Sequence, residues 1–398
     1  MEAYFKNLNS ELKNYQRAIP CLLVDLDILD ENIRFAQSNL RANTNLRIVV
    51  KSLPSVELIE YILQKTATNK LMVFHQPFLS DLVNRLDDKK DVLIGKPMPI
   101  KTAQYFYNNL PQQDKGFNSY SQIQWLVDTE KRIEEYINLA KNINQKLRLN
   151  IEIDVGLHRG GFSSLITLKK GLQLIKENNK YVEFSGFMGY DPHVVKLPRI
   201  IRSQEKASQL ANQFYKKCKD VIKNDFPTLW KENLTFNGAG SPTLNLHKSK
   251  ESPINDISIG SCFVKPSTFD IPSLQEYHPA TFIATPVLKR FKNTTIPGIE
   301  RFKSILNFIS SINKQSYFIY GGFWKADYYY PKKIKENDLF GHSTNQTMIN
   351  SPKNAILKID DFVFLRPHQS EFVFLQFGEI LPVRNRKIQQ PWQLLKNK

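Results

Sequence analysis

The feature of this sequence that most constrains its fold is a regular alternation of short apolar runs and longer amphipathic segments over its first two thirds. The segments between the runs carry apolar residues at helical spacing, as residues 129–144 show. Such alternation is typical of parallel βαβ units, and eight units predict an α/β fold built on a (β/α)₈ TIM barrel. An open, doubly wound parallel sheet is the alternative. The eight apolar runs lie at residues 47–50, 71–74, 91–94, 123–127, 149–154, 182–188, 234–237 and 256–259.

The pattern changes after about residue 270, where apolar runs are separated by turns rich in Pro, Gly, Asn and Lys. A helical period recurs only over residues 300–312. We therefore predict a barrel domain at residues 1–270, followed by a smaller, mostly β domain at residues 271–398. The segment 19–27 precedes the barrel, and its alternation favours a strand that pairs with the β domain.

Composition and charge narrow the classes of function. The chain carries 55 basic and 38 acidic side chains, a net charge of +17, but the lysines are scattered and accompany no known nucleic-acid motif, so we expect no nucleic-acid partner. Cys21, Cys218 and Cys262 lack the paired spacing of a disulfide framework or a thiolate zinc site. No apolar stretch is long enough to cross a membrane, and the opening residues lack a secretory signal, so we expect a cytoplasmic protein with no membrane partner.

Polar residues follow most of the predicted strands, at the end of a barrel where chemistry occurs. One polar residue at a strand end is common and says little; the placement of many of them together favours a functional site. The residues that follow the runs include Lys51, His75, Asp128, Asp154, His158, Arg159, Tyr190, Asp191, His193, Gly238-Ala239-Gly240-Ser241 and Gly260-Ser261.

Lys51 directly follows an apolar strand that brings its amine to the barrel mouth, where neighbouring side chains exclude water. Desolvation makes a lysine more nucleophilic, as Schiff-base chemistry requires, although a lysine at the protein surface is the ordinary alternative. The small residues Gly238, Gly240 and Ser241, with Gly260 and Ser261, occupy the usual phosphate position of such barrels. A lysine on the first strand and a phosphate cradle on the last two predict bound pyridoxal 5'-phosphate.

A tight glycine turn follows the fifth run and gathers two carboxylates, an imidazole and a guanidinium within residues 151–162. Arg159 is a candidate to hold the phenolate oxygen of the cofactor or a substrate carboxylate. Alternatively, Asp154 and Arg159 form a salt bridge that only pins the turn.

These motifs resemble those of the fold type III pyridoxal-phosphate enzymes, the alanine racemase N-terminal-domain superfamily, and within it the D-threonine aldolase and D-serine dehydratase branch. The resemblance implies that Lys51 carries the Schiff base and acts as a base at Cα, that Arg159 steadies the phenolate oxygen and that Tyr190 lies beside the ring. It also implies a head-to-tail homodimer in which the β domain of one subunit completes the active site of the other. The segments that carry the resemblance are residues 19–27, 50–52, 152–162, 188–190, 237–243, 320–322, 343–346 and 366–371.

The sequence departs from the pattern of this superfamily at two places. Racemases of this fold place an arginine against the pyridine nitrogen shortly before the glycine of the last strand, where this chain has Ser258-Ile259-Gly260. Lyases of the branch bind a divalent ion through a His-x-Cys pair, where this chain has His368-Gln369-Ser370. A hydroxyl is a poor zinc ligand, so either an ion is held by His368 with another group such as His342, or none is bound.

The predicted function is therefore that of a pyridoxal-phosphate enzyme acting at the Cα of a small-molecule D-amino acid, of the D-threonine aldolase or D-serine dehydratase kind. The alternative within the fold is an amino-acid racemase, which needs a second base, for which Tyr320 is a candidate. A protein that binds pyridoxal phosphate without catalysis is a further alternative.

Overall fold

The computed structural model describes residues 2–110, 115–196, 203–291, 315–337, 340–351 and 356–396. The chain divides into two compact units. The first consists of Ile33–Cys262, Ile271–Gln275 and Leu395–Lys398, and the second of Met1–Asn32, Phe263–Asp270 and Glu276–Leu394. The predicted helical segment 300–312 lies outside the described residues.

The first unit contains a closed barrel of eight parallel strands, which confirms the predicted fold and excludes the open sheet. The barrel closes where the last strand pairs with the first, with Ile48 opposite Ile259. The strands are β2 (Asn45–Val49), β3 (Lys70–Val73), β4 (Asp91–Ile94), β5 (Ile123–Val127), β6 (Leu147–Glu152), β7 (Val182–Gly189), β8 (Thr235–Gly238) and β9 (Asp256–Ile259).

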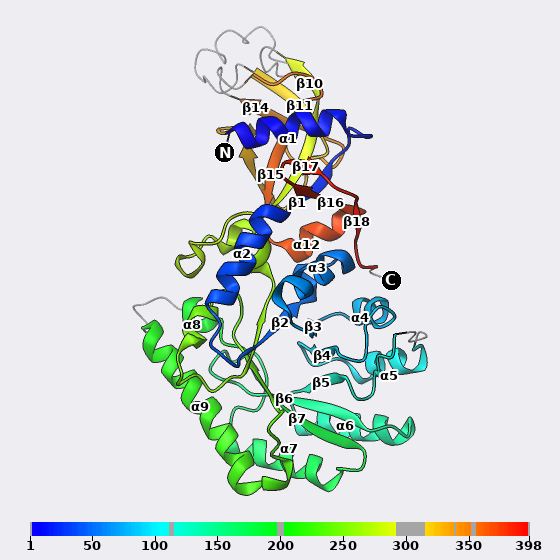
Figure 1. Ribbon diagram of the computed structural model, residues 1–398, viewed down its shortest axis with the longest axis vertical. Helices are drawn as coiled ribbons and strands as arrows, with labels where there is room; N and C mark the ends of the chain where they lie inside the picture. Colours follow the sequence, from blue (N-terminus) through cyan, green and yellow to red (C-terminus); the bar gives the residue numbers. More distant parts are fainter. Residues whose placement is uncertain are drawn as a thin grey trace. The chain divides into compact units, whose positions relative to one another are not determined.

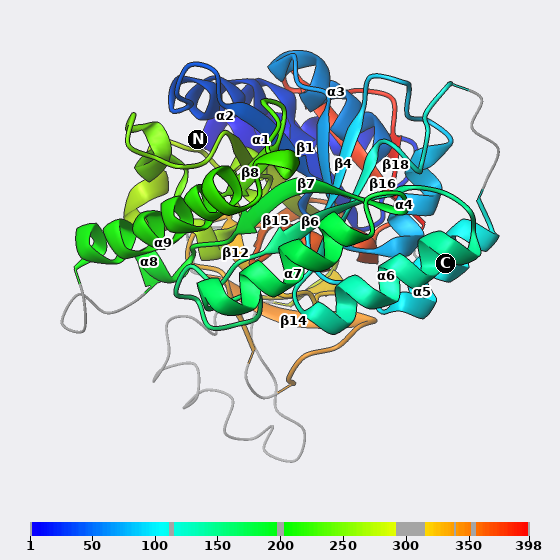
Figure 2. The same ribbon diagram turned by 90° about the horizontal axis from the view of Figure 1, so that it is seen from below.

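Helices follow the strands and lie on the outside of the barrel (Figures 1 and 2). Hydroxyl side chains begin four of them: Ser55, Thr129, Ser164 and Ser203 each accept a hydrogen bond from a backbone N–H of the first turn. The helices are α3 (Val56–Thr66), α4 (Gln76–Val83), α5 (Ile100–Asn108), α6 (Glu130–Asn142), α7 (Leu165–Glu177), α8 (His193–Lys196), α9 (Gln204–Asp225) and α10 (Ser261–Val264), with 3₁₀ turns η1 (Val50–Ser52), η2 (Pro227–Leu229), η3 (Leu244–Lys248) and η5 (Pro272–Leu274).

Side chains that alternate along the strands fill the barrel interior in layers. A middle layer is apolar and comes from five different strands. Its buried members are Val49, Met72, Leu93, Leu126 and Met188. The layer separates the amino ends of the strands from the barrel mouth at their carboxyl ends.

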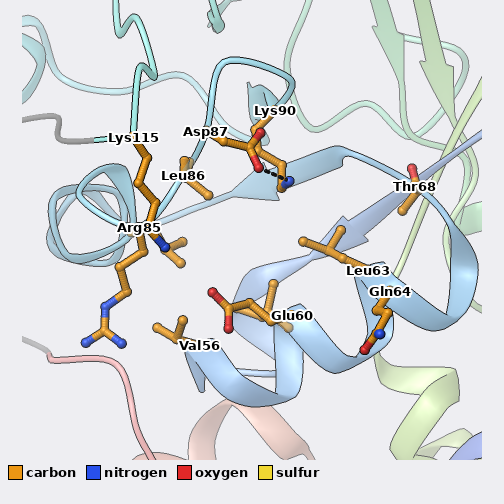
Figure 3. A pocket seen from close by; sticks show the side chains of 12 residues that line it. Val56, Glu60, Leu63, Gln64, Thr68, Arg85, Leu86, Asp87, Lys90 and Lys115 are labelled. Atoms are coloured by element: carbon orange, nitrogen blue, oxygen red, sulfur yellow. Dashed lines mark hydrogen bonds and ion pairs between the residues drawn. The ribbon is translucent and has the colours of Figure 1, made fainter.

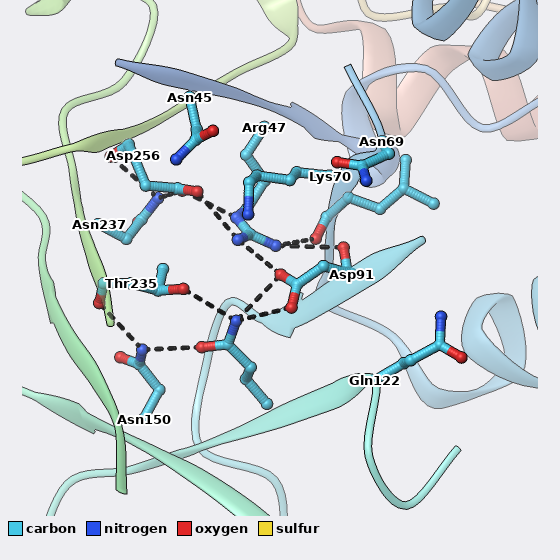
Figure 4. A network of polar contacts seen from close by, with 12 residues as sticks. Asn45, Arg47, Asn69, Lys70, Asp91, Gln122, Asn150, Thr235, Asn237 and Asp256 are labelled. Carbon is cyan, nitrogen blue, oxygen red and sulfur yellow. Dashed lines mark hydrogen bonds and ion pairs between the residues drawn. The ribbon is translucent and has the colours of Figure 1, made fainter. Parts of the chain in front are cut away.

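Toward the amino ends of the strands, the interior is polar, and its side chains form a hydrogen-bonded network around Arg47 (Figure 4). The guanidinium is 0 % exposed. It donates to both carboxylate oxygens of Asp256, at 2.8 and 2.9 Å, and lies 2.7 Å from Asp91. Gln124 and Arg148 donate to the same Asp91 carboxylate. Since a buried charge is costly unless it is paired, this network of opposite charges ties β2, β4 and β9 together.

The described part of the second unit contains a sheet of ten strands. The strands are β1 (Cys21–Asp25), β10 (Thr281–Phe291), β11 (Gln315–Tyr320), β12 (Ala326–Tyr330), β13 (Lys335–Glu336), β14 (Gln346–Ser351), β15 (Phe362–Pro367), β16 (Glu379–Arg384), β17 (Lys387–Ile388) and β18 (Trp392–Gln393). The lead-in strand β1 pairs antiparallel with β10 and parallel with β16, as its alternation predicts. Short helical elements are α2 (Leu26–Ser38), which continues into the first unit, η4 (Ser267–Phe269), α12 (Ser370–Val373) and η8 (Phe374–Gln376).

Helix α1 (Glu2–Asn14), near the start of the chain, was not among the predicted elements. Phe5, Leu8 and Leu12 lie on one face of α1 and pack into a core with the sheet residues Phe282 and Phe364. Their spacing is helical and is the signal that could have predicted the helix. Within the described part of the chain, none of the helices has the length and apolar character needed to span a bilayer.

Candidate active site

Lys51 lies at the carboxyl end of the first barrel strand, where the sequence predicts it. The turn η1 follows β2 directly and carries this side chain at the mouth. Its Nζ lies 4.7 Å from the ring centroid of Phe74, which follows β3. Gly95, after β4, leaves the space that this ring fills, because a Cβ there would come within 2.4 Å of the ring. The lysine is therefore half-buried against an aromatic face instead of extending from the surface.

The last strand brings its small residues against the first. A Cβ at Gly260 would lie 2.9 Å from the carbonyl oxygen of Val49 and 3.0 Å from Cβ of Ser52. The Ser261 hydroxyl donates to the Ser52 hydroxyl at 3.0 Å, and both side chains are buried. Gly260 and Ser261 are thus adjacent to the turn that holds Lys51, on the same end of the barrel.

The loop after β8 contributes the other predicted phosphate residues. The Ser241 hydroxyl accepts a hydrogen bond from the backbone N–H of Cys262 at 3.1 Å, which joins this loop to the segment after β9. Gly240 packs against the ring of Tyr190, so that a Cβ would lie 2.9 Å from the ring. Gly238 ends β8 itself. The glycines allow backbone and hydroxyl groups of two neighbouring loops to approach one anion.

In the glycine turn after β6, Asp154 and Arg159 have other contacts in place of the salt bridge between them that the sequence left open. Asp154 accepts hydrogen bonds from the backbone N–H groups of Gly156 and His158 and from the His158 ring, at 2.8 to 3.0 Å. Arg159 instead lies over the Tyr190 ring, with its guanidinium carbon 5.2 Å from the centroid. Asp154 thus pins the turn, and Arg159 extends from it beside Tyr190.

Glu152 is a titratable residue of the mouth that the sequence analysis did not select as a site residue. It ends β6, and burial raises its pKa from 4.5 to about 7, with Asp128 and Asp154 adding to the rise and Arg159 opposing it. The carboxyl group therefore titrates near neutral pH, in the range where a group can exchange protons with a substrate. The signal in the sequence was its position at a strand end.

Replacing Glu152 with glutamine is expected to stabilise the protein above neutral pH. A raised pKa means that folding favours the protonated carboxyl. Its contribution to the stability of the protein is therefore complete below pH 4.5 and is lost as the pH rises through about 7. Urea unfolding should show equal free energies for the variant and the wild type at pH 4, and an advantage on the order of 2 kcal/mol for the variant at pH 8. An equal difference at both pH values would contradict the raised pKa.

Two predicted site residues belong to the second unit. Tyr320 ends β11 with its side chain 40 % exposed. The His368 Nε2 lies 2.8 Å from Asp327 Oδ1, and His342 Nδ1 lies 2.8 Å from Glu336. Each histidine thus has a different carboxylate partner, and among the residues that the structure describes no three His, Cys, Asp or Glu side chains gather as metal ligands.

A separate cavity lies on the outer side of the barrel, beside α3 (Figure 3). Its polar lining includes Thr68, Asp87 and Lys90, from the loops that lead into β3 and β4, and Asp87 and Lys90 form an ion pair of 2.8 Å. These loops are at the amino ends of the strands. The cavity is therefore distinct from the mouth that carries Lys51.

A family profile described as "Alanine racemase, N-terminal domain" matches residues 24–263 of this chain, from β1 through the barrel. The chain belongs to the alanine racemase N-terminal domain family. This is a family of pyridoxal-phosphate enzymes with the fold type III architecture, as the resemblance of the motifs predicts. A search of curated proteins found no match.

Solved structures with the same fold include a D-threonine aldolase from Filomicrobium marinum, with 13% identity, a TM-score of 0.70 and coverage of 95% of this chain and 97% of the other. An alanine racemase from Bacillus anthracis with bound L-Ala-P shows 14% identity, a TM-score of 0.70 and coverage of 95% and 98%. A D-threo-3-hydroxyaspartate dehydratase from Delftia sp. HT23 shows 12% identity, a TM-score of 0.67 and coverage of 96% and 99%. At these identities the likeness concerns the fold.

The residues at the mouth of this family member fit the family's cofactor. They provide one half-buried amine, at Lys51, and hydroxyl groups on the neighbouring loops, at Ser241 and Ser261. The close contacts at Gly240 and Gly260 leave no room for larger side chains. Pyridoxal phosphate carries an aldehyde and a phosphate on one ring. The aldehyde can react with the amine of the protein, and the phosphate can accept hydrogen bonds from hydroxyl and N–H groups.

Proposed function

We propose that this chain is a pyridoxal-phosphate enzyme that acts at the Cα of a D-amino acid, as a lyase of the D-threonine aldolase or D-serine dehydratase kind. The observation that supports it best is the contact between the last strand and the first: Ser261 is hydrogen-bonded to Ser52, next to Lys51, at 3.0 Å. The amine and the anion cradle therefore share one end of the barrel, within reach of a single cofactor. The D-threonine aldolase and the dehydratase with the same fold agree with this choice.

The side chains of the mouth have distinct roles in this proposal. Lys51 binds the cofactor covalently and moves the proton at Cα, while Gly238, Gly240, Ser241, Gly260 and Ser261 form the two loops that surround the phosphate. Arg159 holds the phenolate oxygen, and Tyr190 lies beside the ring and orients Arg159 through their contact of 5.2 Å. When bound, pyridoxal phosphate supplies an electron sink for the charge that develops at Cα.

Ser258 favours a lyase over a racemase. Its hydroxyl accepts a hydrogen bond from the Asn237 side chain at 2.7 Å, where racemases of the fold are expected to present a guanidinium. The fully buried Arg47 in the same interior is already paired with Asp256 and Asp91, so it does not take that place. A neutral hydroxyl would not supply a charged donor to the pyridine nitrogen of the bound cofactor.

A racemase remains the second candidate because of Tyr320. This side chain is exposed at the end of β11, so it is available to a second copy of the chain. In a head-to-tail homodimer we expect it to complete the mouth of the partner subunit, as the second base of a racemase or as a substrate contact of a lyase.

A panel of D- and L-amino acids distinguishes the candidate reactions. We expect keto acid and ammonia, or glycine and an aldehyde, from a D-configured β-hydroxy amino acid. A racemase would exchange the Cα hydrogen with deuterated solvent and release none of these products. A chain that binds the cofactor and does neither would be a binding protein, and this result would contradict the proposal.

Replacing Gly240 with aspartate is expected to empty the cofactor site. The new Cβ would lie 2.9 Å from the Tyr190 ring, and the carboxylate would repel the phosphate. The bound cofactor, measured by absorbance after gel filtration, should fall by at least about tenfold. Gly240→Ala separates the two causes, since it adds the steric contact without the charge. Unchanged cofactor content in Gly240→Asp would show that this loop does not bind phosphate.

Removing divalent metal is expected to leave most of the activity intact. Ser370 offers a hydroxyl where the lyases of the branch are expected to have a thiolate, and His368 is already paired with Asp327. Activity measured after dialysis against EDTA should stay within about twofold of the untreated protein. Complete loss on chelation, with recovery on adding zinc or manganese, would overturn this prediction.

A further inference from the structure

Four buried polar side chains form a hydrogen-bonded chain beneath the loop that follows β8. They come from two segments that are far apart in the sequence: the residues that follow β7, which carry Asp191, and the stretch 243–252 after β8, which carries the other three. Asp191 and His247 are each 4 % exposed, and Thr243 is 0 % exposed. The fourth member is Ser252, which is also buried.

The bonds run without interruption from the backbone of Gly240 to Ser252. The Gly240 N–H donates a hydrogen bond to the Thr243 hydroxyl at 3.1 Å, and this hydroxyl donates a hydrogen bond to Asp191 Oδ1 at 2.8 Å. The His247 Nε2 donates to the other oxygen, Asp191 Oδ2, at 2.7 Å. The His247 Nδ1 is hydrogen-bonded to Ser252 Oγ at 2.8 Å.

These bonds determine how the loop is folded. The Gly240 carbonyl also accepts from the backbone N–H groups of Thr243 and Leu244, both at 3.0 Å, so both polar groups of this glycine are held inside the loop. Asp191 follows Tyr190 directly, and the Tyr190 ring packs on Gly240. The same short segment after β7 therefore contacts the loop twice, through the ring and through the carboxylate.

We propose that Asp191, Thr243 and His247 are positioning residues that pre-form the phosphate-binding loop. This inference rests on the proposed binding of pyridoxal phosphate at the mouth. The three side chains do not touch the ligand. They hold Gly240 and Ser241 in the conformation that binds an anion, so that no conformational freedom has to be lost when the phosphate binds.

Pyridoxal is the probe that separates this role from a general effect on stability, because it keeps the aldehyde and the ring but lacks the phosphate. We would measure the dissociation constants of pyridoxal phosphate and pyridoxal for the purified full chain by the absorbance of the bound chromophore. In the wild type, pyridoxal phosphate should bind much more tightly. If the wild type does not distinguish the two compounds, the proposed cofactor site and this inference both fail.

Thr243→Val is the most informative variant, because it keeps the shape of the side chain and removes the hydroxyl between Gly240 and Asp191. We expect its affinity for pyridoxal phosphate to fall by about tenfold or more, with the affinity for pyridoxal within about twofold of the wild type. Thr243→Ser restores the hydroxyl and should recover most of the loss. His247→Phe should resemble Thr243→Val, because it removes the donor to Asp191.

Thr281→Val is a matched control, because Thr281 is equally buried and its hydroxyl donates to the carbonyl oxygen of Leu23 at 3.0 Å, in the β sheet of the second unit. It should change neither affinity. Hydrogen exchange of the Gly240 amide, measured without ligand, should be faster in Thr243→Val than in the wild type. An unchanged preference for pyridoxal phosphate in Thr243→Val, or an equal loss of affinity for both compounds, would overturn the proposal while leaving the cofactor site itself intact.

Discussion

Replacing Lys51 with alanine is expected to abolish covalent attachment of the cofactor and to lower kcat by at least about 10³-fold. Its amine lies half-buried on Phe74, and the residue after it, Ser52, is hydrogen-bonded to Ser261, where we propose that the phosphate binds. Borohydride reduction followed by peptide mapping should label Lys51 in the wild type and leave no label in the variant.

Lys96 offers a matched control, because it also follows a barrel strand, β4, but its side chain is exposed. Lys96→Ala should keep the yellow colour of the bound cofactor, the borohydride label on Lys51 and the activity of the wild type. Labelling of a lysine other than Lys51 in the wild type would be incompatible with the proposed site. Activity retained in Lys51→Ala would contradict the chemistry assigned to this residue.

Replacing Arg47 with methionine is expected to destabilise the protein by about 3 to 5 kcal/mol. The guanidinium is fully buried, and its removal leaves Asp256 and Asp91 inside the barrel without their main partner (Figure 4). Chemical denaturation at pH 7 would measure the loss. Lys169→Met is the control, because it breaks an exposed ion pair with Asp225 and should cost less than about 1 kcal/mol.

The effect of Arg47→Met should depend on pH in a defined direction. Burial favours a raised pKa for Asp91, but Arg47, Arg148 and Lys70 outweigh it and hold the pKa below its usual value. The charge of Asp91 therefore stabilises the wild type above the usual carboxylate range, and this stabilisation is lost as the pH falls. In the variant, Asp91 keeps Arg148 but loses Arg47, so its charge stabilises the fold less, and the difference in unfolding free energy should be smaller at pH 4 than at pH 7. If the difference in unfolding free energy between the wild type and Arg47→Met is larger at pH 4 than at pH 7, the charge of Asp91 is not stabilised by Arg47 as described.

Local patterns in the sequence were sufficient to predict the barrel. The predicted strands 91–94, 123–127 and 256–259 agree with β4, β5 and β9, because apolar residues recur in each over the length of a short strand. The prediction for β6 was shifted toward its carboxyl end. It missed Leu147 and Arg148, since a charged residue inside a strand is unexpected until its partner Asp91 is known. It included Asp154, whose carboxylate in fact holds the glycine turn.

The candidate site was predictable to the extent that it depends on strand ends. Lys51, Tyr190 and the glycine loops follow their strands directly, so a correct strand assignment is enough to bring them to one end of the barrel. The catalytic and binding roles of these residues, and those of Tyr320 and His368, stay predictions. Glu152 also lies at the end of a strand. Its pKa near 7 depends on burial and on the charges of Asp128 and Arg159, which no local pattern in the sequence reveals.

The order of apolar and polar residues along the chain was thus enough to specify eight parallel strands and the end of the barrel at which chemistry is expected, because strand periodicity is a property of neighbouring residues. The pairing of Arg47 with Asp256, and of His247 with Asp191, 56 residues away, arose only when the barrel closed. Hydrogen bonds and charge interactions act over a few ångströms in space, so partners distant in sequence are determined by the folded structure.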